Sequence, residues 1–215
     1  MKFSIVTVVK NSVDTIENCM ISVQSQIYDS FEHIIIDGKS TDGTLEKIAL
    51  LRDYKTFMLS REDSGLYDAL NNSKNLITGE YVILLHSDDV FTNINVLKDI
   101  AMELEEHPSI DALFCGIEFQ NHKNAIVRKW QSKAFSFIGY RMGWSPPHTG
   151  IVFRESTYKI LLPFNLEYKI ASDYDFVIRF LSSSKNYAFS GLKITIMTLG
   201  GTSTNYRDYF TTLME

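Results

Sequence analysis

Short runs of β-branched and aliphatic residues alternate with segments of helical periodicity over the first 85 residues. Residues 3–9 form the first run, and apolar residues then recur at intervals of three and four, which predicts a helix with one apolar face: Val13, Ile16, Met20, Val23 and Ile27. Further strands are predicted at 33–36, 57–59 and 81–85. The helices between them carry Leu45, Ile48 and Leu51, and then Leu66, Ala69, Leu70 and Ile77. This alternation predicts a parallel sheet covered by helices.

The pattern changes after residue 93. A helix with Val96, Leu97, Ile100 and Leu104 is expected to end near Pro108, and segments 112–120 and 125–130 read as a hairpin. Residues 143–148 contain a glycine and two adjacent prolines, which predict irregular structure. A last helix is expected to begin at Ser172, followed by a strand at 193–199. The chain is therefore predicted to be one α/β domain over residues 1–215, with a mostly parallel central sheet and a more mixed C-terminal half.

Composition narrows the class of protein. The 215 residues, 45% hydrophobic and 22% charged, are typical of a globular protein of one or two domains. Cys19 and Cys115 are expected to be buried thiols of a reducing compartment. The formal net charge of −5 and the lack of a basic run argue against a nucleic-acid partner. The apolar N-terminal stretch is too short for a signal peptide, and no run approaches a transmembrane length, so a cytoplasmic location is expected.

Carboxylates follow three of the predicted strands, and ligands of open α/β sheets bind outside the carboxyl ends of strands. These carboxylates are Asp37, Asp63 and the pair Asp88 and Asp89. Each alone is typical of a turn or a helix cap, but three at one edge indicate a binding site. Because the chain has no glycine-rich phosphate loop, an acidic edge would need a cation to bind phosphate. Asp88 and Asp89 suit Mg²⁺ or Mn²⁺, so the sequence predicts binding of a nucleotide diphosphate.

Five motifs, in this order along the chain, resemble a known family. They are SIVTVVKN at 4–11, IIIDGKSTDGT at 34–44, EDSGLYDALN at 62–71, GEYVILLHSDD at 79–89 and ASDYDFVIRF at 171–180. Together they resemble the inverting nucleotide-sugar glycosyltransferases of the GT-A fold, in glycosyltransferase family 2, which includes bacterial polysaccharide and lipopolysaccharide enzymes. The resemblance extends over about residues 3 to 200 and implies the Rossmann-like GT-A fold.

The resemblance implies a set of contacts with a nucleotide-sugar donor. Asp37 is similar to the carboxylate that contacts the uracil or ribose, and the backbone around Thr7 and Val8 would line the base pocket. Asp63 is similar to a further nucleotide contact. Gly65 would let the chain pass close to the ligand. All five residues are therefore expected to bind the donor.

The motif at 86–89 is similar to the metal motif of the family, with one difference. Asp88 resembles the metal-bound carboxylate, which also places it at the donor, and Asp89 is its neighbour in the expected Mn²⁺ or Mg²⁺ site. His86 stands where the family has the first aspartate. His148 is similar to a histidine that precedes a short strand in some relatives, and it could contact diphosphate, metal or acceptor. A lone histidine is equally compatible with a structural role.

Asp173 resembles the general base of the family, at the start of the late helix. An inverting transfer requires a carboxylate that takes the proton of the attacking acceptor hydroxyl. The alternative for Asp173 is a carboxylate that stabilises the first turn of the helix, and for Asp175 this alternative is preferred.

The resemblance implies an inverting, metal-dependent transfer of a sugar from a UDP-linked donor to a hydroxyl of a glycan or lipid-linked saccharide. Residues 1–110 would bind the nucleotide, and 111–215 would supply the acceptor site and the base. The resemblance implies bacterial surface polysaccharide assembly, in the cytoplasm or peripherally at the inner face of the membrane. Two alternatives stay open. One is a nucleotidyltransferase, although its phosphate loop is missing, and the other is a catalytically silent nucleotide-sugar binding module, which His86 keeps open.

Overall fold

The computed structural model describes residues 1–134, 139, 145–183 and 186–199. The first half of the chain forms a parallel sheet in the order β3-β2-β1-β4. Its strands are β1 (Phe3–Val9), β2 (Phe31–Asp37), β3 (Thr56–Ser60) and β4 (Tyr81–Leu84). The crossovers contain α1 (Ile16–Gln24), α2 (Thr44–Leu51) and α3 (Leu66–Asn71). Because the four strands are parallel, their carboxyl ends meet at one edge of the sheet.

The second half of the chain extends this sheet with strands of both directions. Its strands are β5 (Val90–Phe91), β6 (Ala112–Gln120), β7 (Ile126–Trp130), β8 (Ile151–Arg154) and β9 (Tyr187–Thr198). Beyond β4 the order is β8-β6-β9-β5, in which only β6 and β9 pair in parallel, and β7 forms a hairpin with β6. The helices are α4 (Val96–Glu106), α6 (Glu155–Leu161) and α7 (Ser172–Ser183), and η1 (His148–Gly150) is a short 3₁₀ turn.

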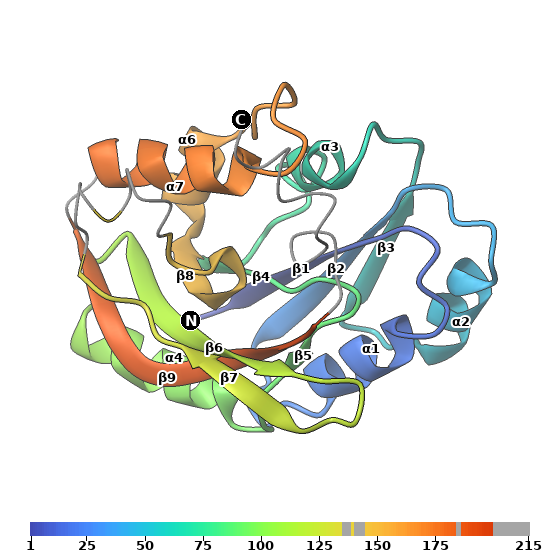
Figure 1. Ribbon diagram of the computed structural model, residues 1–215, viewed down its shortest axis with the longest axis horizontal. Helices are drawn as coiled ribbons and strands as arrows, with labels where there is room; N and C mark the ends of the chain where they lie inside the picture. Colours follow the sequence, from blue (N-terminus) through green and yellow to red (C-terminus); the bar gives the residue numbers. More distant parts are fainter. Residues whose placement is uncertain (135–138, 140–144, 184–185, 200–215) are drawn as a thin grey trace.

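Helices cover both faces of the sheet, with α1 and α4 on one side and α3, α6 and α7 on the other (Figure 1). Successive side chains of β1 point to opposite faces of the sheet, so this strand contributes to the hydrophobic core on each face. Phe3 and Ile5 pack toward α1 and α4, and Val6 and Val8 pack toward α3, α6 and α7. Full burial of one such side chain contributes about 1.5–3 kcal/mol. The predicted α/β architecture is confirmed, with a parallel first half and a mixed second half.

Some element boundaries differ from the sequence expectations. Helix α1 ends at Gln24, so Ile27 lies outside it and is half exposed. Helix α3 ends at Asn71, because the hydroxyl and the N–H of Ser73 both turn back to the carbonyl of Leu70. The sequence reading also missed β5, β8 and α6. Residues 145–147 have no regular structure, as expected, while 143 and 144 lie outside the described residues.

Cys19 and Cys115 are free, buried thiols, as their number and spacing suggested. Within the described ranges, no helix is long and apolar enough to cross a membrane.

A buried polar pair lies inside the core beneath α1. The Thr7 hydroxyl lies 2.9 Å from Nε2 of His33, and Nδ1 of His33 has no hydrogen-bond partner among the described residues. Burial lowers the pKa of His33 to about 4. The folded protein therefore holds this ring neutral at a pH at which the unfolded chain already binds a proton, since an unperturbed histidine has a pKa near 6.5.

This shift leads to an expected dependence of stability on pH. As pH falls from about 6.5 to about 4, the free energy of unfolding should decrease by about 3 kcal/mol because of His33. In this pH range His33 binds a proton in the unfolded chain and not in the folded protein. Urea unfolding of the wild type and of His33→Gln at several pH values in this window measures the difference. The variant should show a shallower loss of stability with acid, and equal slopes would contradict the assignment.

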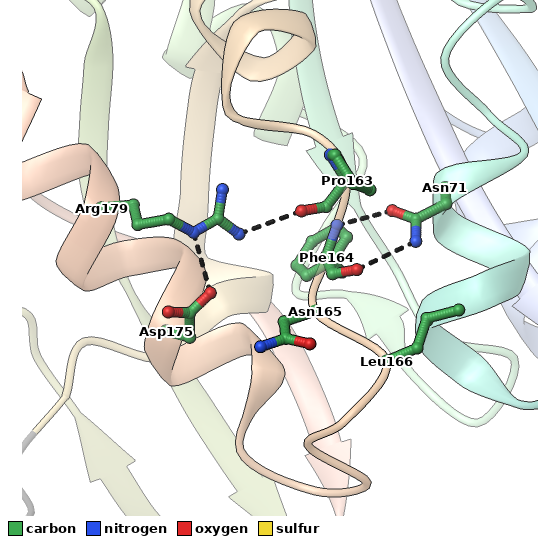
Figure 2. Close-up of a pocket in the computed structure, with 7 residues that line it drawn as sticks. All are labelled: Asn71, Pro163, Phe164, Asn165, Leu166, Asp175 and Arg179. Atoms are coloured by element: carbon green, nitrogen blue, oxygen red, sulfur yellow. Dashed lines mark hydrogen bonds and ion pairs between the residues drawn. The ribbon is translucent and has the colours of Figure 1, made fainter.

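The first turn of α7 is fixed by a cluster around Arg179 (Figure 2). Asp175 accepts a hydrogen bond from Arg179 Nε at 2.8 Å, and the guanidinium also donates to the carbonyls of Leu161 and Pro163. A hollow of about 450 Å³ lies beside this cluster and is lined in part by Pro163, Asp175 and Arg179. Asp175 is paired with Arg179 within α7, a contact that the sequence did not predict.

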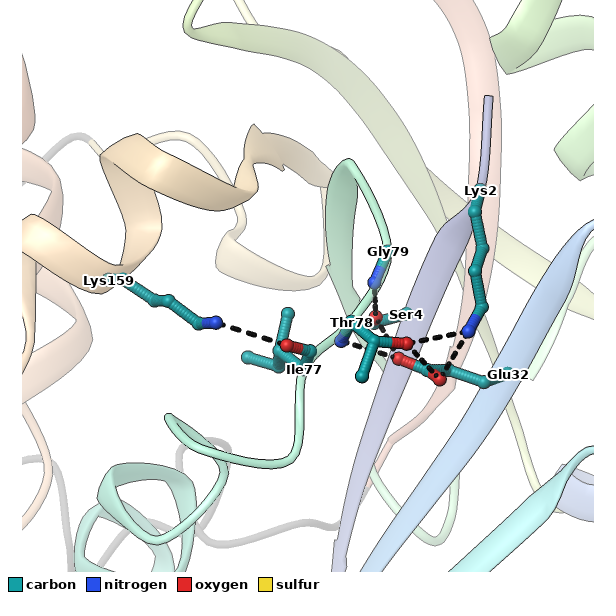
Figure 3. A network of polar contacts seen from close by, with 7 residues as sticks. All are labelled: Lys2, Ser4, Glu32, Ile77, Thr78, Gly79 and Lys159. Carbon is teal, nitrogen blue, oxygen red and sulfur yellow. Dashed lines mark hydrogen bonds and ion pairs between the residues drawn. The ribbon is translucent and has the colours of Figure 1, made fainter.

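A second polar network ties the strands together at the amino edge of the sheet (Figure 3). The Glu32 carboxylate accepts hydrogen bonds from Lys2 Nζ at 2.7 Å, Ser4 Oγ at 2.6 Å and the Thr78 backbone N–H at 2.8 Å. Burial raises the pKa of Glu32, but these bonds outweigh it and lower the pKa overall. A Cβ at Gly79 would lie 2.7 Å from the backbone nitrogen of Ser4, so the loop before β4 can approach β1 only with glycine there. This edge holds the fold together and leaves the opposite edge for the site.

Candidate active site

Asp37 ends β2 at the carboxyl edge of the sheet and is fully buried. Its carboxylate accepts a hydrogen bond from Ser60 Oγ at 2.7 Å, and both oxygens lie 3.2 Å from the backbone nitrogen of Ser40. These contacts tie the ends of β2 and β3 together. The carboxylate is consequently held in one orientation before any ligand arrives.

Asp63 lies against the loop that follows Asp37. A Cβ at Gly38 would lie 2.5 Å from Asp63 Oδ2, so any other residue there would displace the Asp63 carboxylate. Asp63 Oδ1 accepts a hydrogen bond from the Gly65 backbone N–H at 3.1 Å. Gly65 has a φ of 131°, which strongly favours glycine. The structure thus brings the expected nucleotide contacts Asp37 and Asp63 to neighbouring positions.

The loops after β1, β2 and β4 bind one another and form a continuous rim. Ser40 Oγ accepts a hydrogen bond from the Asn11 backbone N–H at 2.8 Å, and Asn11 Oδ1 accepts one from the Thr41 N–H at 2.9 Å. The hydroxyl of Ser12 accepts a hydrogen bond from that of Ser87 at 3.0 Å. Thr7 and Val8 lie just beneath this rim, with side chains buried on opposite faces, so only their backbone remains to line a base pocket.

The turn after β4 presents one exposed and one buried carboxylate. Asp88 is exposed, whereas Asp89 is 1% exposed and its Oδ2 has no hydrogen-bond partner within the described residues. Burial raises the pKa of Asp89, and the charge of Asp88 raises it further. Negative charge at this turn is therefore poorly compensated, which fits a bound cation. The described residues contain no ready cluster of three or more metal-binding side chains, and Mg²⁺ needs only one or two carboxylates when phosphate and water supply the rest.

A chain of hydrogen bonds runs from this turn to the first turn of α7. His86 Nε2 lies 2.6 Å from His148 Nε2, and His148 Nδ1 lies 2.8 Å from Asp173 Oδ2. Asp173 Oδ1 accepts a hydrogen bond from the Tyr174 backbone N–H at 2.9 Å, and the Tyr67 hydroxyl, whose shorter contact is with the carbonyl of Ile170, lies 3.2 Å from the same oxygen. These hydrogen bonds connect residues from both halves of the sequence at one place.

The environment of Asp173 keeps its carboxylate ionised. Burial raises its pKa, but the attraction and hydrogen bond of His148, together with the bonds from Tyr174 and Tyr67, lower the pKa overall. The side chain is still 28% exposed, so the carboxylate is reachable from outside. An ionised, partly exposed and rigidly held carboxylate can accept a proton from a bound hydroxyl.

Comparison with known proteins decides the family. Residues 4–166 match the family model described as Glycosyl transferase family 2. This chain belongs to glycosyltransferase family 2. A PGL/p-HBAD biosynthesis glycosyltransferase of Mycobacterium bovis is 27% identical over 184 residues, which make up 84% of this chain and 70% of that relative.

Two solved structures place this family 2 chain in the GT-A fold, as its motifs suggested. S. aureus TarS 1-349 in complex with UDP-GlcNAc superposes with a TM-score of 0.79 at 24% identity, covering 96% of this chain and 62% of TarS. The mannosyltransferase PcManGT from Pyrobaculum calidifontis, in complex with GDP-Man and Mn²⁺, gives 0.69 at 18% identity, covering 97% and 59%. The chain thus spans about three fifths of the length of these solved proteins, and at these identities the likeness shows the fold.

Sequence reasoning on this family 2 chain missed three residues of the site. Tyr67 lies within the quoted motif EDSGLYDALN, but a tyrosine one position after an apolar residue reads as core. His86 was noticed only as a departure from the metal motif. Gly38 was part of a turn, and nothing in the sequence indicated that Asp63 lies against it. All three depend on contacts between segments far apart in the chain.

Proposed function

We propose that this protein is an inverting, metal-dependent glycosyltransferase that moves a sugar from a UDP-linked donor to a hydroxyl of a glycan or lipid-linked saccharide. One observation carries the proposal. The partly exposed carboxylate of Asp173 is linked through His148 to His86, two residues before the exposed Asp88, at the edge where Asp37 and Asp63 also lie. A donor-binding edge and a proton acceptor therefore face one region.

In the proposed reaction, the acceptor hydroxyl attacks the anomeric carbon in line with the departing nucleoside diphosphate. Asp173 takes the hydroxyl proton as the new glycosidic bond forms, and the bond to the diphosphate oxygen breaks. Its lowered pKa leaves it ionised at neutral pH, as this role requires. Attack from the face opposite the leaving group inverts the anomeric configuration.

Asp88 would hold the divalent cation, with Asp89 behind it in the same turn. A bound Mn²⁺ or Mg²⁺ would stabilise the negative charge that develops on the leaving diphosphate. The residues that orient the nucleotide are Asp37, Asp63, the Gly65 turn and the backbone at Thr7 and Val8. Asp37 is rigidly held, so it would lose little conformational freedom when it binds a ribose or base.

The identity of the donor and acceptor is proposed from relatives. A structure of S. aureus TarS 1-349 in complex with UDP, 25% identical to this chain, supports a uridine nucleotide. The Mycobacterium bovis relative is named for PGL/p-HBAD biosynthesis, which supports a biosynthetic role for this chain. We further propose action in the cytoplasm, peripherally at the inner face of the membrane where lipid-linked acceptors are found.

Thermal unfolding in the presence of candidate ligands tests this function. UDP and a panel of UDP-sugars, each with Mn²⁺, should raise the melting temperature, since a ligand at a hundred times its dissociation constant adds about 2.7 kcal/mol. Stabilisation by nucleoside triphosphates and sugar phosphates instead would favour a nucleotidyltransferase. Stabilisation by a UDP-sugar without any release of UDP, even with acceptors, would favour a silent binding module.

Removal of the Asp37 carboxylate should weaken UDP binding by about 1–3 kcal/mol, the usual loss when a hydrogen bond to a charged group is removed. Isothermal titration of Asp37→Ala with UDP measures this change. Asp29→Ala is the matched control, because Asp29 is exposed before the amino end of β2 and its loss alters net charge equally. An unchanged affinity in folded Asp37→Ala would return Asp37 to a purely structural role at the turn.

A further inference from the structure

His86 occupies the position at which the family has the first aspartate of its metal motif, yet its ring is engaged elsewhere. Its Nε2 faces Nε2 of His148 at 2.6 Å, and the two rings meet edge to face with centroids 4.9 Å apart. His148 in turn contacts Asp173 through its other nitrogen. A residue expected beside the cation is therefore connected to the proposed base.

The two facing nitrogens can share one hydrogen bond, because an imidazole ring can donate from one nitrogen and accept at the other. A neutral imidazole carries one N–H and one bare nitrogen. With Nδ1–H of His148 directed at Asp173, a neutral His148 has a bare Nε2, which accepts the hydrogen bond that His86 Nε2–H donates.

Both ring nitrogens of His148 are thus engaged by protein groups, and this decides between its candidate roles. A contact with diphosphate, metal or acceptor would need one of these nitrogens to leave its partner. We propose that His86 and His148 are positioning residues for Asp173, and that His86 has exchanged the metal contact of the motif for this task. The inference rests on the proposed role of Asp173 as the base.

The arrangement fixes both oxygens of the carboxylate. Tyr67 and the Tyr174 N–H hold Oδ1, and His148 holds Oδ2. A carboxylate oxygen has two lone pairs, so Oδ2 can accept the acceptor proton while it stays bonded to His148. His86 prevents His148 from rotating, which keeps the carboxylate at one angle to the incoming hydroxyl. Such outer partners typically change rates by about 10- to 100-fold when they are removed.

Kinetics of donor hydrolysis by the full chain test this inference. The probe is the UDP-sugar of the panel that the wild type hydrolyses fastest, with UDP release as the signal. His148→Leu and His86→Leu should each lower kcat by about 10- to 100-fold and leave the donor KM within about twofold. His148→Asn should recover most of the rate because its amide nitrogen replaces Nδ1. His86→Gln should recover most of the rate because its amide can donate or accept.

The order of the hydrogen-bonded series, from His86 through His148 to Asp173, gives a sharper test. In the His148→Asn background, His86→Leu should have no further effect, because the atom that His86 contacts is already gone. The calorimetric affinity for Mn²⁺ in the presence of UDP should be equal in the wild type and His86→Leu. His122→Leu, in the exposed loop of the β6–β7 hairpin, is the control and should behave as the wild type.

Three outcomes would overturn the inference. They are a raised donor KM with unchanged kcat in the leucine variants, weakened Mn²⁺ affinity in His86→Leu, or additive losses in the double variant. If His86→Leu does not fold, His86→Phe takes its place, because it keeps a flat ring without nitrogens. A large loss of kcat in His86→Gln would also contradict the inference. Failure of the wild type to release UDP from any donor would instead overturn the proposed function itself, and this inference with it.

Discussion

Asp173→Asn should bind a UDP-sugar nearly as tightly as the wild type and turn it over roughly 10²- to 10⁴-fold more slowly, as expected when a positioned proton acceptor is lost. Asparagine keeps the volume of the side chain and its amide oxygen can still accept hydrogen bonds from Tyr67 and the Tyr174 N–H. It cannot take up the acceptor proton. Titration calorimetry gives the donor affinity, and UDP release gives the turnover.

Asp175→Asn is the matched control for this experiment. Asp175 lies in the same turn of α7 and carries the same charge, but its carboxylate is paired with Arg179. Its replacement should cost stability and leave kcat close to that of the wild type. Loss of turnover in Asp175→Asn together with full turnover in Asp173→Asn would show that Asp175, and not Asp173, is the base.

Asp88→Asn should remove the part of UDP binding that depends on metal and reduce turnover by on the order of 10²-fold or more, since a bound cation contributes several kcal/mol to a developing negative charge. Asp88 is the exposed carboxylate of the turn after β4, and burial raises the pKa of its neighbour Asp89 strongly. UDP titrations with and without MnCl₂ measure the effect.

The wild type should bind UDP more tightly with Mn²⁺, and Asp88→Asn should bind it equally with and without the ion. Asp14→Asn removes the same charge from an exposed position near α1 and should retain the gain from Mn²⁺. A full gain from Mn²⁺ in Asp88→Asn would contradict the metal assignment.

The parallel half of the fold could be predicted from sequence. Each of its strands is a short run of apolar residues, and the segments between the strands have apolar residues at helical spacing. Strand β8 could not be predicted, because four apolar residues after an irregular segment do not reveal a partner strand, and β8 pairs with β4 about 70 residues earlier in the chain. Strand β5 has only two residues, too few for any periodicity.

The same distinction holds for the site. Asp37, Asp63 and Asp88 could be proposed from sequence because residues that follow parallel strands share an edge, whatever the details of packing. The contact between His86 and His148 spans 62 positions and exists only because β8 runs antiparallel to β4, which returns the start of β8 to the edge where β4 ends. Tyr67 reaches Asp173 across 106 positions for a similar reason. Sequence pattern places residues on elements, and tertiary packing decides which side chains meet.

Proton NMR of the sugar released from donor tests the central claim most directly. The full chain is incubated with Mn²⁺ and α-linked UDP-glucose, UDP-galactose or UDP-N-acetylglucosamine in the absence of acceptor, so that water takes the place of the acceptor hydroxyl. The account predicts release of UDP and initial appearance of the β-anomer before mutarotation, at a rate that Asp173→Asn reduces. Initial release of the α-anomer would contradict an inverting transfer at this site.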